Sequence, residues 1–305
     1  MISDYIRLSS VSMRGKFHAF LLALDKGHFS IRRDFSLVFL CGANKTELVP
    51  SERRSFIKLA IERHLPHTRI VYAEKVMEEL VKHGSTKNLL DIEHQISSIA
   101  DWVLIVLESY SSFCELGAFA DKASRKKLIV INDQNFRSQQ SFINMGPLQA
   151  IAEDVSPEHV LWYPMRSDGI FNVDAIGQTL PALFKVISKR KNREKLEKDK
   201  FLPRNINQNS LFFLHDLIFL CGPITHPELI SIYKEIFGDH SFDEIKALRG
   251  VLHASGLLEV KDVGGVHSYI STNNETFIDY GHSATEIMTA FRRYHFKFNP
   301  HRLLA

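Results

Sequence analysis

The sequence predicts two folded parts, an α/β domain built on a parallel sheet and a smaller domain of helices with one hairpin. Short apolar runs alternate with helical segments across the first two-thirds of the chain, which favours parallel strands with helices on both faces. A charged stretch at 189–200, followed by Pro203 and a polar run, marks a change in composition. We therefore place an N-terminal helical segment at 1–30, an α/β domain at 31–200 and a second domain at 201–305.

Five segments of the first part have the composition of buried strands, since they are short, apolar and bounded by polar or glycine residues. They lie at residues 36–42, 69–73, 102–107, 127–131 and 160–163. Helical spacing of apolar residues predicts helices at 50–64, 74–82, 89–99, 112–123, 144–153 and 173–190. This alternation indicates a flavodoxin-like sheet with flanking helices rather than a full dinucleotide-binding double unit.

The second part has the order of elements of a winged helix-turn-helix domain. Ser241 and Glu244 have the spacing of a capping box that opens a third helix, and Gly256 ends that helix. Turn-forming residues at 262–265 then separate two strand-like segments. Winged helices bind DNA in some proteins and protein partners in others, so the plan alone does not decide the partner. The predicted helices before Ser241 lie at 211–220 and 227–237, and the strands at 257–261 and 266–270.

The composition excludes several classes of protein. A chain of 305 residues with 45% hydrophobic content can bury two cores, so we expect no wholesale disorder. The formal net charge of +3 does not by itself indicate a nucleic-acid-binding protein, so any basic surface must be local. No apolar run approaches the roughly 20 residues of a membrane span and no signal peptide is recognisable, so we expect a cytoplasmic protein without membrane association.

Cysteine and histidine patterns argue against a metal site or a disulfide framework. Cys41, Cys114 and Cys221 are far apart, and each lies in an apolar setting typical of a reduced, buried thiol. The 15 histidines include no HExxH motif and no paired Cys/His spacing, so we expect no metal. The sequence also lacks a GxGxxG fingerprint, a P-loop and a GxSxG elbow, which removes three common catalytic or nucleotide-binding motifs.

The remaining candidates follow the predicted strands, at the edge where open α/β sheets bind ligands. Gly42, Ala43 and Asn44 come after the first strand. A small residue there lets a ligand approach backbone N–H groups, and the Asn44 side chain could bond a sugar or a phosphate. A tight turn explains Gly42 without any ligand, and the sequence does not decide between the two explanations.

Glu115 is the candidate for chemistry. It follows the strand at 102–107, and we expect its neighbours Ser111, Ser112 and Gly117 to contact the substrate. Gly117 would allow close packing of the helix against the sheet or a ligand. Ser112 and Glu115 have capping-box spacing, so Glu115 has a purely structural explanation. In the alternative, Glu115 faces a ligand and stays ionised beside the positive end of its helix. A fixed carboxylate can attack the anomeric carbon of a sugar or stabilise an oxocarbenium-like transition state.

Three segments together resemble the nucleoside 2′-deoxyribosyltransferase family. They are FLCG at 39–42, ADWVLIVL at 100–107 and FCELGA at 113–118. The resemblance implies that Glu115 is the nucleophile on the deoxyribose, and that Asp101 lies near the base or aids proton transfer. Asp101 has a structural explanation as well, as a residue at the start of a strand.

The loop before Glu115 departs from that family, which usually has a Gly- and Asp-bearing loop where this chain has SYSS at 109–112. The segment SSFCEL at 111–116 is also similar to the helix of TIR domains, whose glutamate cleaves the nicotinamide–ribose bond of NAD. Both resemblances imply cleavage of an N-glycosidic bond, with NAD or a deoxynucleotide as substrate and no cofactor. Transfer, hydrolysis and NAD cleavage stay open. The first family also implies homo-oligomers, in which neighbouring subunits complete one another's sites.

Basic residues of the second part are candidates for nucleic-acid contact. The third helix would be the recognition helix, and the hairpin would be the wing. The tail at 291–302 interleaves cations with aromatic rings, a pattern suited to phosphate contact and stacking, although an amphipathic helix docked on its own domain has the same pattern. The candidates are Lys246, Arg249 and His253 on the helix, Lys261 and His267 on the wing, and Arg292 and Arg293 in the tail.

The layout of the whole chain resembles the effector of a retron antiviral defence system. The resemblance implies a toxic enzyme held inactive by the retron reverse transcriptase with its msDNA/msRNA hybrid. Release on phage infection would then deplete a nucleotide pool. Two other functions stay open: a DNA-binding regulator whose α/β domain senses a nucleotide without turnover, and a salvage transferase, for which a winged helix has no evident purpose.

Overall fold

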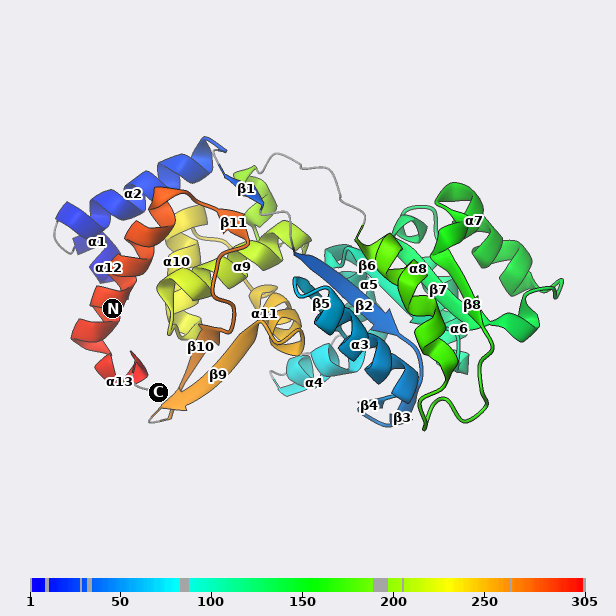
Figure 1. Ribbon diagram of the computed structural model, residues 1–305. Helices are drawn as coiled ribbons and strands as arrows, with labels where there is room; N and C mark the ends of the chain where they lie inside the picture. Colours follow the sequence, from blue (N-terminus) through cyan, green and yellow to red (C-terminus); the bar gives the residue numbers. More distant parts are fainter. Residues whose placement is uncertain are drawn as a thin grey trace. The chain divides into compact units, whose positions relative to one another are not determined.

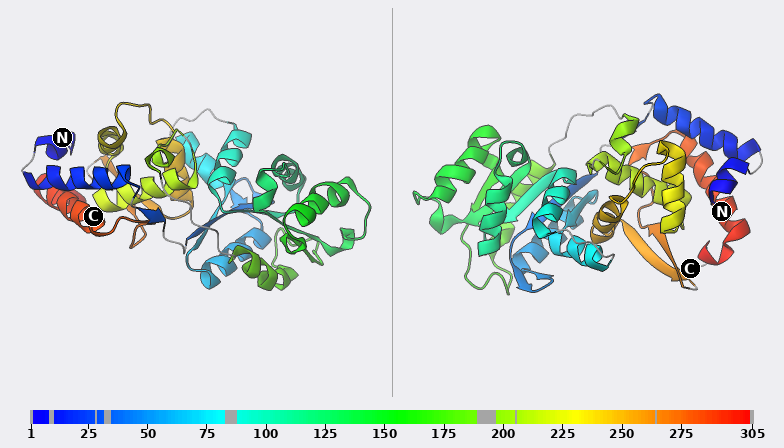
Figure 2. Two further views of the ribbon diagram at one scale, coloured as in Figure 1. Left: turned by 90° about the horizontal axis from the view of Figure 1, so that it is seen from above. Right: turned by 180° about the vertical axis from the view of Figure 1, so that it is seen from behind.

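The computed structural model describes residues 2–8, 11–27, 29–31, 35–82, 88–188, 197–204, 206–263 and 265–303. The chain divides into two compact units, whose helices and strands are shown in Figure 1 and Figure 2. Unit 1 comprises residues 1–33, 79–85 and 192–305, and unit 2 comprises residues 34–78 and 86–191. The N-terminal helices therefore belong to the same unit as the last third of the chain.

Unit 2 contains a five-stranded parallel sheet with the order β5-β2-β6-β7-β8. All five strands lie where the apolar runs predict them, and the three central strands β2, β6 and β7 are buried on both faces. The order changes direction between β2 and β6, which makes their carboxyl ends the switch point where such sheets bind ligands. The strands are β2 Ser36–Cys41, β5 Thr68–Val71, β6 Trp102–Val106, β7 Leu128–Asp133 and β8 Val160–Tyr163.

Helices cover both faces of this sheet (Figure 2). On one face, α3 (Glu52–His64) and α8 (Leu180–Ile187) bury apolar side chains against alternate residues of β2 and β6. On the other face, Phe39 of β2 contacts Phe119 of α6 (Tyr110–Phe119), with ring centroids 6.0 Å apart. The ring of Phe119 also meets His94 of α5 (Leu89–Ile99) at 5.6 Å, so α5 and α6 are neighbours there.

The other elements of unit 2 are short. A hairpin of β3 (Asn44–Thr46) and β4 (Val49–Pro50) follows β2, and α4 (Ala73–Lys82) follows β5. The helix predicted at 144–153 is a π-helix followed by α7, and the one predicted at 173–190 is a 3-10 helix followed by α8. These and the remaining short helices are η1 Ser124–Lys127, η2 Gln134–Phe136, η3 Asn144–Leu148, α7 Gln149–Asp154, η4 Pro157–His159 and η5 Ala175–Thr179.

Unit 1 joins the two ends of the chain. Helix α2 packs against α12 and α1 packs against α10, while β1 pairs with β11 in an antiparallel sheet. Aromatic contacts contribute to this packing. The ring centroids of Tyr5 and Tyr294 lie 4.9 Å apart, and those of Phe20 and Tyr280 lie 5.5 Å apart. The elements are α1 Ile2–Leu8, α2 Val11–Asp25, β1 Ser30–Ile31, η6 Lys198–Phe201, α9 Gln208–Cys221, α10 His226–Phe237, α11 Ile245–Ala254, β9 Leu258–Val263, β10 Val266–Ser271, β11 Ile278–Asp279, α12 His282–Phe298 and α13 Pro300–Leu303.

The three helices α9, α10 and α11 and the β9–β10 hairpin confirm the predicted order of elements in this unit. The capping box predicted for Ser241 and Glu244 is wrong. The Ser241 hydroxyl donates to the Asp243 carboxylate at 2.7 Å, and α11 begins only at Ile245 without a side-chain cap. The Ser241 hydroxyl therefore bonds to the Asp243 carboxylate and does not cap α11.

Three further expectations can be compared with the structure. Among the helices described, none is long and apolar enough to cross a membrane. Cys41 and Cys221 are buried, but Cys114 is exposed, so the prediction of a buried thiol is wrong at Cys114. Residues 189–196 of the charged stretch at 189–200 lie outside the described residues.

Candidate functional site

Glu115 lies in the second turn of α6, the helix that follows β6 at the carboxyl edge of the sheet. The helix begins two residues earlier than predicted because Ser109 caps it. The Ser109 hydroxyl accepts from the Ser112 N–H at 3.3 Å, and the Ser112 hydroxyl accepts from the Ser109 N–H at 3.1 Å. The capping box therefore uses Ser109 and Ser112, and the structural explanation of Glu115 as a capping residue is wrong.

The Glu115 carboxyl is mostly buried and incompletely bonded. Its Oε2 atom is buried and has no hydrogen-bond partner among the described residues. The pKa of Glu115 is raised from 4.5 to about 8, mainly by burial; the charges of Glu93 and Glu74 contribute to this rise and the charge of Arg54 opposes it. A pKa near 8 favours the protonated carboxyl at neutral pH, in contrast to the ionised carboxylate that the sequence analysis expects. Helix-dipole stabilisation fades beyond the first turn, so desolvation dominates at this position.

A second carboxyl with a raised pKa comes from the neighbouring helix α5. Glu93 is 7% exposed and lies on the face of α5 that otherwise buries Ile92, Ile96 and Ile99. Burial raises its pKa to about 7, with Glu74 acting in the same direction and Arg54 opposing. An acidic residue on an apolar helix face was a signal available in the sequence, and our sequence analysis missed it.

Arg54 is the cation of this cluster. It is 2% exposed, its Nη1 lies 2.9 Å from the Glu74 carboxylate, and its guanidinium lies 4.6 Å from the centre of the Tyr72 ring. The charges of Arg54, Glu74, Glu93 and Glu115 all act on the buried thiol of Cys41 at the end of β2, whose pKa burial raises. The cluster therefore gathers side chains from β2, α3, α4, α5 and α6 at one edge of the sheet.

Asp101 does not belong to this cluster. It precedes β6, so it lies at the amino end of the strand, whereas Glu115 follows the carboxyl end. Its Oδ2 accepts the Leu37 N–H at 2.9 Å, and its own N–H donates to the Leu37 carbonyl at 2.8 Å. The structure thus supports the structural explanation of Asp101 and does not bring it together with Glu115.

The loop after β2 is held by protein groups. The Ala43 N–H donates to Glu108 Oε1 at 3.0 Å, and Asn44 Oδ1 accepts from Arg54 Nη1 at 2.6 Å. Gly42 has φ +152°, and a Cβ there would lie 2.9 Å from both Arg54 Cδ and Glu108 Oε1. The packing of the loop thus requires glycine, and two groups predicted to hold a ligand already have partners.

The smaller residues around α6 have different environments. The Ser111 hydroxyl is exposed and lies 2.9 Å from the Ser109 hydroxyl. Ser112 is buried in the capping box, and Gly117 is exposed with open space where a Cβ would lie. Of the three, only Ser112 has a structural role that is evident from its contacts.

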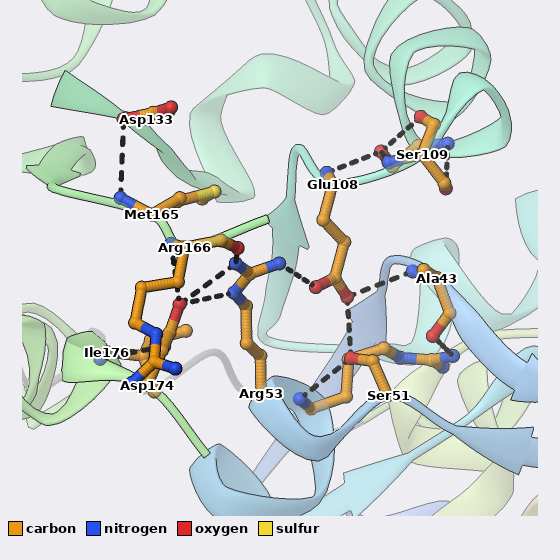
Figure 3. Close-up of polar contacts among 12 residues, drawn as sticks. Ala43, Ser51, Arg53, Glu108, Ser109, Asp133, Met165, Arg166, Asp174 and Ile176 are labelled. Carbon is orange, nitrogen blue, oxygen red and sulfur yellow. Dashed lines mark hydrogen bonds and ion pairs between the residues drawn. The ribbon is translucent and has the colours of Figure 1, made fainter. Parts of the chain in front are cut away.

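A second network of buried charges fixes the loops after β2, β6 and β8 (Figure 3). Glu108, fully buried, accepts from Ser51 Oγ at 2.6 Å and from Arg53 Nη1 at 2.9 Å, in addition to the Ala43 N–H. Arg53 Nε donates to Asp174 at 3.0 Å. Asp174 also accepts from the Tyr163 hydroxyl and from the backbone N–H groups of residues 166 and 176. Every carboxylate here has several donors, so the network is structural.

The candidates for nucleic-acid contact differ in accessibility. Arg249 is 5% exposed, lies 4.6 Å over the Tyr269 ring and donates to His226 Nδ1 at 3.3 Å, so it packs inside unit 1 rather than projecting from a recognition helix. His267 is exposed and lies 3.2 Å from the Asp262 carboxylate. Lys246, Arg292 and Arg293 are exposed, while His253 and Lys261 are half-buried.

In the part of the chain that the structure describes, no group of three or more His, Cys, Asp or Glu side chains could hold a metal ion.

Comparison with known proteins places the chain in a family. Residues 50–260 match the family described as STM3845 retron effector protein. The chain is 39% identical over 277 residues to the Escherichia coli protein named "Retron Ec73 putative ribosyltransferase/DNA-binding protein", covering 87% of this chain and 86% of that protein. It is 37% identical over 83 residues to the E. coli "Retron Ec86 putative ribosyltransferase/DNA-binding protein", covering 27% of each. The chain therefore belongs to the STM3845 family of retron effector proteins.

Proposed function

We propose that unit 2 cleaves the N-glycosidic bond of a nucleotide, and that the chain is the toxic effector of a retron defence system. Membership of the retron effector family supports the biological role. The words "ribosyltransferase/DNA-binding" in the names of two relatives support a glycosyl-transfer activity. The strand order of the sheet is that of flavodoxin-like folds, which bind nucleotides at the same switch point.

The observation that carries the proposal is the pair of carboxyls Glu93 and Glu115, with pKa values raised to about 7 and about 8. Because the charge of Glu93 raises the pKa of Glu115, their protons are best assigned to the pair. Between these two values the pair holds about one proton, and it thus offers one carboxylate and one carboxylic acid. Cleavage of a glycosidic bond with a covalent intermediate needs that combination.

In the proposed reaction, substrate binding places the one proton of the pair on Glu93, and a carboxylate oxygen of Glu115 attacks C1′ of the sugar as the bond from C1′ to the base nitrogen breaks. The electron pair of that bond leaves with the base, and Glu93 gives its proton to the base nitrogen. Water then attacks C1′ of the glycosyl ester, Glu93 takes a proton from this water, and Glu115 is released as carboxylate. A second base in place of water would give transfer instead of hydrolysis.

The substrate is a nucleotide, with NAD and deoxynucleotides as the two candidates. Nicotinamide leaves NAD as a neutral molecule and needs no proton, whereas a neutral nucleobase leaves as an anion unless it is protonated. Glu93 should therefore matter much more for deoxynucleotides than for NAD. Chromatography of free base from the two substrates, with wild type and Glu93→Gln, distinguishes them.

Nucleotide cleavage is tested directly with the purified chain, with and without the retron reverse transcriptase and its msDNA/msRNA hybrid. Wild type should release free base, and Glu115→Gln should lose at least about a thousandfold of this rate while keeping its fold. Glu153→Gln, on the surface helix α7, is the matched control and should behave as wild type. Nucleotide binding by wild type without base release would favour the alternative, a regulator that senses a nucleotide.

We also propose that unit 1 is a winged helix that binds the nucleic acid of the retron complex. Helices α9, α10 and α11 and the β9–β10 hairpin support this, as does the isolated antiparallel bridge between Ile224 and Tyr269 of the hairpin. Lys246, Arg292 and Arg293 are the exposed cations that we assign to phosphate contact. Arg249 would instead stabilise the hairpin through Tyr269.

A further inference from the structure

We propose that Arg54 is a positioning residue of the Glu115 site, which fixes the loop after β2 and supplies the positive charge that keeps a carboxylate available at Glu93 and Glu115. The proposal rests on the proposed function, since it concerns the same two carboxyls. It assigns a role to a residue that touches no reacting atom and that no motif of the sequence marks.

The contacts of Arg54 show how it fixes the loop. Its Nη2 donates to the Leu40 carbonyl at 2.9 Å, and its Nη1 donates to the Ala43 carbonyl at 3.2 Å and to Asn44 Oδ1 at 2.6 Å. The three acceptors lie at the end of β2 and in the loop that follows. A planar guanidinium can bind several acceptors in fixed directions, so Arg54 holds this backbone in one conformation.

A second set of contacts holds the guanidinium itself. Glu74 lies 2.9 Å from Nη1, the Tyr72 ring lies 4.6 Å below the guanidinium, and the Tyr72 hydroxyl donates to the Arg54 carbonyl at 3.2 Å. The Nε atom is buried and has no hydrogen-bond partner among the described residues. Arg54 thus cannot leave its position without breaking bonds on two sides.

The charges that face Arg54 come from every element packed around it. They are Cys41 on β2, Tyr72 directly before α4, Glu74 on α4, Glu93 on α5 and Glu115 on α6. All five groups are neutral or negative, and each of the four whose pKa shifts is lowered by Arg54 and raised by Glu74. Arg54 and Glu74 therefore act in opposite directions on Glu93 and Glu115.

Arg53 provides the contrast within the same helix turn. It is 3% exposed, similar to Arg54, but its guanidinium binds Glu108 and Asp174 in the other network. If any buried arginine in this turn of α3 lowered the pKa of Glu115, both Arg53 and Arg54 would do so. The proposal predicts that only Arg54 does.

The test is a titration of Glu115 by carboxyl ¹³C NMR in the full chain, with the signal assigned by its loss in Glu115→Gln. Arg54→Gln should move the Glu115 titration to higher pH, and Glu74→Gln should move it to lower pH, each by about half a unit or more. Arg53→Lys should lower the melting temperature without moving the titration. A Glu115 titration that stays in place in folded Arg54→Gln would overturn the proposal.

The double variant Arg54→Gln/Glu74→Gln covers the case in which Arg54→Gln alone does not fold, since it leaves neither charge of the ion pair unpaired. It should titrate at higher pH than Glu74→Gln, and equal titration of the two would overturn the proposal. Arg54→Lys keeps the charge but not the planar contacts, so its titration should stay near that of wild type while KM for the nucleotide rises.

The titration tests the role of Arg54 and the turnover assay tests the proposed function, so the two proposals can be overturned separately. If the titration moves as expected and no variant releases base, the proposed function is wrong while the electrostatic role of Arg54 holds. If wild type releases base and the titration does not move, the proposed function holds and the role of Arg54 is wrong.

Discussion

Two groups of buried charges lie at the carboxyl edge of the same sheet, and they are built in opposite ways. In the Glu108–Arg53–Asp174 network, each carboxylate accepts several hydrogen bonds and faces a guanidinium. In the Glu93–Glu115 cluster, three carboxyls face one arginine, and Glu115 leaves one oxygen without a partner among the described residues. Complete pairing stabilises a loop, whereas incomplete pairing leaves carboxyls that exchange protons near neutral pH.

The largest effect that separates the two groups, after loss of the nucleophile itself, is on activity. Glu93→Gln removes the proposed proton donor, so release of a neutral nucleobase should fall about a hundredfold or more, within the usual range for general acid catalysis. The melting temperature should hardly change. Chromatographic assay of free base checks the rate, and an unchanged rate with every nucleotide tested would show that Glu93 is not the acid.

Glu108→Gln should have the opposite profile. Removing one partner of a buried ion pair typically costs about 3–5 kcal/mol of the free energy of unfolding, because the other charge stays buried and unpaired. Urea unfolding at pH 7 measures this loss. The matched variant Glu47→Gln, on the hairpin turn after β3, should unfold as wild type does. A Glu108→Gln protein of normal stability would contradict a structural role for the network.

Stability should depend on pH through Glu115. Its folded-state pKa is raised from 4.5 to about 8, so the protonated form stabilises the fold and this contribution is lost as pH rises from about 4.5 through about 8. Glu115→Gln should therefore melt a few degrees higher than wild type at about pH 9 and nearly the same at about pH 5. Equal melting temperatures at both pH values would contradict the raised pKa.

A smaller effect distinguishes exposed from buried arginines in unit 1. Joint substitution of Arg292 and Arg293 by Ala should weaken nucleic-acid binding severalfold. The slope of the logarithm of the binding constant against the logarithm of the salt concentration should fall by the equivalent of up to about two phosphate contacts. The control is joint substitution of Lys122 and Lys126, two exposed lysines of unit 2, by Ala. Fluorescence anisotropy at several salt concentrations measures both, and equal behaviour of the two proteins would exclude α12 from the interface.

The smallest effect is expected at Asp101. Asp101→Asn keeps the shape of the side chain but weakens its bond to the Leu37 N–H, so stability should fall by about 1 kcal/mol. Base release should stay within about threefold of wild type, because Asp101 lies at the far end of β6 from Glu115. A loss of activity without loss of stability would restore the role implied by the family resemblance.

The sequence predicts the strands well because each contains a short apolar run, which is longest in the central strands β2, β6 and β7 that helices cover on both faces. It predicts the helix that carries Glu115 but not its first residue, since Ser109 and Ser112 are both suitable for a cap and only the folded backbone selects between them. Where two residues can both cap a helix, the surrounding folded structure determines which of them does.

The candidate site is less predictable than the fold. Glu115 stands out through a short motif, but its protonation depends on Glu93, Glu74 and Arg54, which lie 22 to 61 residues away in sequence and meet only in the fold. Asp101 shows the converse, because a position matched by resemblance lies at the other end of its strand. Burial and charge at a site are properties of the packed structure.

The most direct test of the account is the pH dependence of kcat/KM for base release from a deoxynucleotide by the wild-type protein, because this ratio reports the pKa values of the free enzyme. A Glu93–Glu115 pair that works with one shared proton predicts a bell-shaped kcat/KM, with limbs near the two raised pKa values of about 7 and about 8. Glu93→Gln should lose one limb of that curve. A wild-type kcat/KM that stays constant between about pH 5.5 and about pH 9 would contradict the account.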